Sequence, residues 1–78
     1  MALPNDLDYK AVIKALEKAG FKLDGGLKNH LKFKRPRMSA NDMVRIVIVP
    51  MHKEIATGTL RSIVEQSGIS REEFLKLL

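Results

Sequence analysis

Residues 28–34, with the sequence Lys-Asn-His-Leu-Lys-Phe-Lys, alternate between polar and apolar side chains, and this pattern constrains the fold most strongly. Successive side chains of a β-strand point to opposite faces, so Leu31 and Phe33 share one face. The side chains expected on the other face are His30, Lys32 and Lys34. We therefore expect a strand whose apolar face packs on helices and whose polar face suits a phosphate backbone.

His30 is the one side chain of this polar face that suits acid–base chemistry. Imidazole ordinarily changes its charge between pH 5 and 8, whereas lysine remains protonated there. His30 is therefore the candidate for taking up or releasing a proton at neutral pH. The alternative is an exposed strand histidine that only contacts RNA or solvent.

The positive charge of the chain is concentrated around this strand. The net charge is +5, and residues 22–37 contain six basic side chains against one acidic side chain, Asp24. The remainder of the chain is balanced, with eight basic and eight acidic residues. A localised basic patch indicates an anionic partner, although a solvated lysine face is an equal alternative. The six residues are Lys22, Lys28, Lys32, Lys34, Arg35 and Arg37.

Length and composition indicate one small domain over residues 1–78. The absence of cysteine excludes disulfides and thiolate metal sites, and His30 and His52 alone do not make a credible metal site. No stretch approaches the ~20 apolar residues of a membrane span, and no signal peptide is recognisable. We expect a cytoplasmic protein without metal, nucleotide cofactor or membrane contact.

Hydrophobic periodicity and capping residues predict the order helix, three strands, helix, short helix. The first helix is expected at 9–19, with Asp8 or Asp6 as its N-cap and Gly20 ending it. Strands are expected at 21–23, 28–34 and 44–49, with a turn at 24–26 between the first two. The helix at 57–67 precedes a last helix that begins at a Ser70–Glu73 capping box, with Phe74, Leu77 and Leu78 facing inward.

The strand at 44–49 is rich in β-branched residues and apolar on both faces apart from Arg45, so we expect it at the centre of the sheet. Strands with short links form an antiparallel meander, and the helices must cover one face of it. The predicted fold is an α+β sandwich of double-stranded-RNA-binding type, with order α-β-β-β-α, a three-stranded antiparallel sheet and a short C-terminal helix.

Three stretches of the sequence resemble HicA-type toxins, the RNA-cleaving partners in HicA–HicB toxin–antitoxin pairs. Residues 12–21 resemble the opening helix and first strand of that family, and 29–33 resemble the strand bearing its catalytic histidine. Residues 49–74, with Gly-Thr-Leu-Arg-Ser-Ile at 58–63, resemble its C-terminal half and are the most specific match. Where the family has Gly-Ser before the histidine, this chain has Lys28-Asn29. The link at 36–43 is also longer than the usual turn.

This resemblance implies an endoribonuclease that cleaves mRNA and is neutralised by a HicB-type antitoxin covering the histidine face. His30 is then the catalytic base for metal-independent transesterification, and His52 is a possible secondary acid. With residue 34 paired to about 44, His30 lies opposite about 48 and His52 follows just past the strand end; a solvated loop histidine is the alternative. The residues expected to bind RNA are Lys28, Lys32, Lys34, Arg35 and Arg37.

Other interpretations remain open. Lys28-Asn29 in place of Gly-Ser favours a non-catalytic RNA-binding module of the same fold, and a pure protein-interaction subunit is a third possibility. In the second helix, Thr59, Arg61 and Ser62 are candidates either for RNA contact or for no role beyond the helix. Capping and solvent exposure explain Glu73 and Glu72 better than catalysis does.

Overall fold

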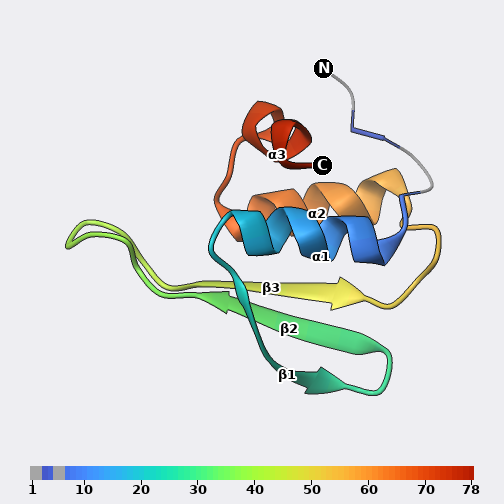
Figure 1. The fold of residues 1–78 in the computed structure, drawn as a ribbon, viewed down its shortest axis with the longest axis horizontal. Coiled ribbons are helices and arrows are strands. Elements are labelled where there is room, and N and C mark those ends of the chain that lie inside the picture. The colour runs from blue at the N-terminus through green and yellow to red at the C-terminus, as the bar shows by residue number, and fades with distance from the viewer. Residues whose placement is uncertain (1–2, 5–6) are drawn as a thin grey trace.

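The computed structural model describes residues 3–4 and 7–78 and confirms the predicted α+β order. The elements are α1 (Tyr9–Lys18), β1 (Lys22–Leu27), β2 (His30–Arg35), β3 (Arg45–Pro50), α2 (Thr57–Ser67) and α3 (Arg71–Leu77). The three strands form one antiparallel sheet in the order β1-β2-β3. All three helices lie on one side of the sheet, nearest to β3, while β1 lies farthest from them (Figure 1).

Capping residues place the ends of the helices much as the sequence indicates. The Asp8 carboxylate accepts a hydrogen bond from the Lys10 N–H at 2.9 Å, while Asp6 lies outside the described residues. Ser70 caps α3 by accepting from the Glu73 N–H at 3.1 Å. Gly20 follows α1 with a φ of 97°, a conformation that disfavours side chains, and therefore ends that helix.

The core forms between the helices and the inner face of the sheet. Its largest buried side chains are Phe21, Phe33, Phe74, Leu16, Ile55, Leu60 and Ile63. Phe33 and Val47 are neighbours across β2 and β3, so the alternation predicted for β2 is confirmed. Leu78 is the exception among the expected core residues of α3: it follows the helix and is 40% exposed.

The predicted position of the turn between the first two strands is wrong. Residues 24–26 are not a turn but belong to β1, where the pairing shifts between Leu23 and Gly26 as a bulge. The turn consists of Lys28-Asn29, because Leu27 pairs with His30. The strand predicted at 28–34 therefore begins at His30 rather than at Lys28.

The second correction concerns β3, which is an edge strand and not the centre of the sheet. Three consecutive strands in a meander place the second strand between the others. Because the helices cover only the inner face of the sheet, the apolar outer positions of β3 are left uncovered: Ile46 is 44% and Ile48 40% exposed. The edge itself is protected near its end, since the Ile48 N–H donates to the Gln66 Oε1 at 3.0 Å and Pro50 has no N–H.

Candidate active site and nucleic-acid interface

His30 is the first residue of the central strand and lies at one end of the sheet. Its partners are Leu27 on β1 and Pro50 on β3. The side chain is exposed, and no described residue forms a hydrogen bond or ion pair with the imidazole. An imidazole in this position is accessible to a substrate lying across the sheet.

The backbone of His30 is packed against Gly26 on the neighbouring strand. A Cβ atom at Gly26 would overlap the His30 carbonyl oxygen and lie 3.0 Å from the Leu31 Cα. Gly26 also has a φ of 144°, which side chains disfavour. The glycine therefore allows β1 to approach β2 closely where His30 is held.

The outer face of the sheet, opposite the helices, carries a row of side chains that consists of His30 and two lysines. Along β2 this row consists of His30, Lys32 and Lys34, which alternate with the inward Leu31 and Phe33. Positions two apart on a strand are separated by about 6.6 Å. Lys32 lies 3.8 Å from the Asp24 carboxylate, an exposed ion pair that contributes little stability. We call His30, Lys32 and Lys34 the β2 row.

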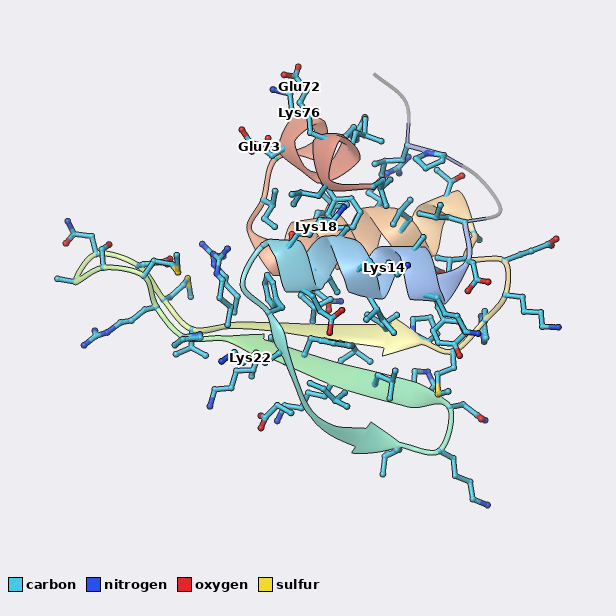
Figure 2. All side chains as sticks on the ribbon, viewed as in Figure 1. Lys14, Lys18, Lys22, Glu72, Glu73 and Lys76 are labelled. Carbon is cyan, nitrogen blue, oxygen red and sulfur yellow. The ribbon has the colours of Figure 1, made fainter. Side chains whose placement is uncertain are left out.

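Lys22 joins this face although it is absent from the predicted RNA-binding residues. It pairs directly with Lys34 across β1 and β2, so both side chains lie on the same face. Figure 2 shows Lys22 beside the sheet, whereas Lys14 and Lys18 lie on α1. Only the register of β1 and β2 places Lys22 beside Lys34, and the turn predicted at 24–26 did not indicate this pairing.

The structure does not bring Arg35 together with the β2 row. Its guanidinium lies over the Phe21 ring, 5.1 Å from the centroid, and 4.0 Å from the Asp42 carboxylate. Only 14% of the Arg35 side chain is exposed. Arg35 therefore connects the inner face of the sheet to the link that follows β2. Lys28 and Arg37, which are also predicted to bind RNA, are exposed in the loops on either side of β2.

The link at 36–44 extends from the sheet as an arm (Figure 1). Asp42 organises it by accepting hydrogen bonds from the Met38 N–H at 2.9 Å and the Met43 N–H at 2.8 Å. These two bonds, together with the charges of Arg35 and Arg45, hold the pKa of Asp42 below its usual value. The arm is therefore an ordered extension of the sheet.

His52 lies just beyond β3, at the same end of the sheet as His30. The observed register pairs Lys34 with Ile46 and His30 with Pro50, two residues along from the register we expected. Backbone hydrogen bonds bind this end together: the Met51 N–H donates to the Asn29 carbonyl at 2.9 Å, and the Tyr9 N–H donates to the His52 carbonyl at 3.2 Å. The partner of His30 on β3 is therefore Pro50, two residues before His52, and not residue 48, four residues before it.

The remaining candidates lie elsewhere in the fold. Thr59, Arg61 and Ser62 are exposed on α2, in the helical layer. Glu72 and Glu73 lie on α3, far from the sheet (Figure 2). Among the described residues, no group of three or more His, Cys, Asp or Glu side chains is arranged to hold a metal ion. No helix in the same part of the chain has the length and apolarity needed to cross a membrane.

These features define a small α+β protein of double-stranded-RNA-binding type with an open sheet face that carries a histidine and lysines. Comparison with known protein families matches residues 9–69 to the HicA toxin of bacterial toxin–antitoxin systems. The chain therefore belongs to the HicA toxin family and is a toxin of a toxin–antitoxin pair. Comparison with curated proteins gives no significant match.

Proposed function

We propose that this chain is an endoribonuclease that cleaves mRNA through His30 and is neutralised by a HicB-type antitoxin. The observation that carries the proposal is the exposed His30 in line with Lys32 and Lys34 on the uncovered sheet face. Membership of the HicA family supports this activity, and the basic patch supports an RNA substrate.

The reaction is transesterification within the RNA chain. His30 accepts the proton of a ribose 2′-OH, and the 2′-oxygen attacks the adjacent phosphorus. The bond from phosphorus to the 5′-oxygen breaks, leaving a 2′,3′-cyclic phosphate on one product. The departing 5′-oxygen takes a proton, for which His52 is the candidate donor because it lies at the same end of the sheet. These proton transfers and the bond exchange need no metal ion.

Lys32 and Lys34 stabilise the negative charge of the RNA as point charges. Their spacing along β2, about 6.6 Å, is suited to successive phosphates of one strand. All three phenylalanines are buried, so none of them forms a stacking platform for bases on the outer face. We therefore propose that the RNA is held through its backbone, with Lys22 as an additional phosphate contact.

Expression of the chain without an antitoxin tests the proposal directly in bacteria. We expect growth arrest by the parent chain and relief by His30→Ala at equal protein level. Arrest by both chains would place the toxicity at another residue. Arrest by neither, with both proteins folded, would contradict the nuclease.

The second candidate is a non-catalytic RNA-binding module, favoured by Lys28-Asn29 in the turn before the histidine. A module of this kind binds RNA through the β2 row and leaves it intact. RNA retardation without product formation by the purified parent chain would support this function instead.

A further inference from the structure

The outer face of the sheet is chemically divided between its central and edge strands. Across β2 and β3, Lys32 pairs with Ile48 and Lys34 pairs with Ile46. Cross-strand neighbours have Cβ atoms about 5 Å apart, so each lysine lies beside an isoleucine. We call Ile46 and Ile48 the apolar row.

The apolar row is uncovered in the isolated chain, with both isoleucines at least 40% exposed. The arm that precedes β3 also has exposed apolar side chains, those of Val44, Met43 and Met38. RNA phosphates gain nothing from aliphatic side chains, whereas the centre of a protein interface is apolar. The row is therefore unsuited to the substrate that we propose for the β2 row.

The edge of β3 is blocked to a further strand at two positions near this row. The Ile48 N–H already donates to Gln66, and Pro50 has no N–H to donate. Because the side chains of Ile46 and Ile48 project from the outer face, a ligand of the apolar row lies on that face of the sheet. This position also covers the neighbouring Lys32 and Lys34.

The charge on the same face determines which kind of partner fits. Lys22, Lys32 and Lys34 lie on this side of the sheet, and Asp24 is the one carboxylate placed against them in the described structure. A second copy of the chain would bring like charges together, which disfavours self-association. An acidic protein with apolar side chains beside its carboxylates matches both rows.

We infer that the apolar row is the anchor by which an acidic protein partner, the antitoxin, holds the toxin, while RNA uses the β2 row and Lys22. This inference rests on the proposed function and adds that the antitoxin is anchored on β3, beside the side chains that contact RNA. Binding of RNA and binding of the partner are then separable by substitution and by salt. The partner blocks the nuclease by covering the β2 row from its anchor on β3.

The experiment compares the parent chain with a double variant, Ile46→Thr with Ile48→Thr. Threonine keeps the β-branched shape that suits a strand and removes part of the apolar surface. Leu23→Thr is the matched control, because Leu23 is exposed but pairs with Phe33 and so lies on the other face. Thermal melting of each protein checks its folding.

The binding probe is the protein encoded by the reading frame adjoining the toxin gene, tagged and produced in the same cells. We expect its complex with the parent chain to persist in about 1 M NaCl, where the Debye length is only about 3 Å. The double variant should bind about tenfold more weakly or worse. Leu23→Thr should bind like the parent, and all three proteins should cleave a labelled RNA equally.

Several outcomes would overturn the inference. These are dissociation of the parent complex in high salt, no capture by the parent chain, or equal binding by the double variant. Equal loss of RNA cleavage and partner binding would assign the row to RNA, and a parent dimer lost in the double variant would assign it to a second copy. If the parent chain cleaved no RNA but its complex with the partner still depended on the two isoleucines, the proposed nuclease activity would be refuted. The inference that the apolar row anchors the partner would still be supported.

Discussion

Gly26 lies against His30 so closely that a methyl group on the glycine would overlap the histidine's carbonyl oxygen. The obstructing atom belongs to the backbone and cannot rotate away as a flexible side chain can. The conformation of Gly26, with φ at 144°, adds to the cost of any side chain there. The position of the proposed catalytic residue therefore depends on a glycine in the neighbouring strand.

Gly26→Ala should lower both the stability of the protein and the rate of RNA cleavage. We expect a loss of about 1–3 kcal/mol in the free energy of unfolding, from backbone strain and displacement of β2. Gly25→Ala is the matched control, because Gly25 also has a positive φ, 99°, but no atom lies within 4 Å of its added Cβ. Denaturant unfolding and cleavage assays distinguish the two; equal effects would refute the importance of the contact with His30.

Gly25 and Gly26 explain why the first turn was predicted at the wrong residues. Asp-Gly-Gly is typical of a hairpin turn, and glycine tolerates a bulge equally well. Only the pairing of Leu27 with His30 decides between these conformations. Because Leu27 pairs with His30, Lys28 lies in the turn. The pairing of Lys22 with Lys34 likewise depends on the register of β1 and β2, which the sequence pattern does not determine.

The elements themselves were predictable because local patterns and caps agreed. Asp8, Gly20 and Ser70 mark helix ends by local hydrogen bonding or backbone conformation, and the structure uses them as expected. Arg35 was less predictable. Its position after Lys34 suggested one continuous basic patch, yet alternation along β2 turns it inward, where Phe21 and Asp42 hold it.

Lys34→Gln should weaken RNA binding at every sequence tested and reduce its salt dependence. If Lys34 contacts one phosphate of a single strand, the slope of log K against log salt should change by about 0.7. Lys14→Gln on α1 is the charge-matched control and should leave both quantities unchanged (Figure 2). Filter-binding or anisotropy titrations at several salt concentrations measure them; an equal effect of the two substitutions would indicate non-specific attraction.

Asp42→Asn should make the stability of the protein less sensitive to acid. The folded-state pKa of Asp42 is depressed, first by hydrogen bonds from the Met38 and Met43 N–H groups. A depressed pKa means that the carboxylate's stabilisation is present above the unfolded-state pKa, near 3.8, and is lost as pH falls through the lower folded-state pKa. Unfolding measured from neutral pH into this acid range should show a smaller stability loss in the variant; identical pH profiles would contradict the prediction.

Gly58→Ala should stabilise the protein. Gly58 is the second residue of α2, with no atom within 4 Å of an added Cβ, and no positive φ opposes the substitution. Alanine is favoured over glycine by about 0.5–1 kcal/mol in the middle of a helix, and we expect a gain at the lower end of this range in the first turn. Thermal or denaturant unfolding measures the gain, and a lower midpoint with an unchanged m-value would contradict it.

The most direct test of the central claim is the rate at which the purified chain and its His30→Ala variant cleave a labelled RNA. We predict cleavage by the parent, a 2′,3′-cyclic phosphate product, and a rate lower by about 10²–10⁴ in the folded variant. His52→Ala serves as the companion, since a role as the acid predicts a loss of rate and a change in the acid-dependent limb of the pH profile. Undiminished cleavage by folded His30→Ala would contradict the account.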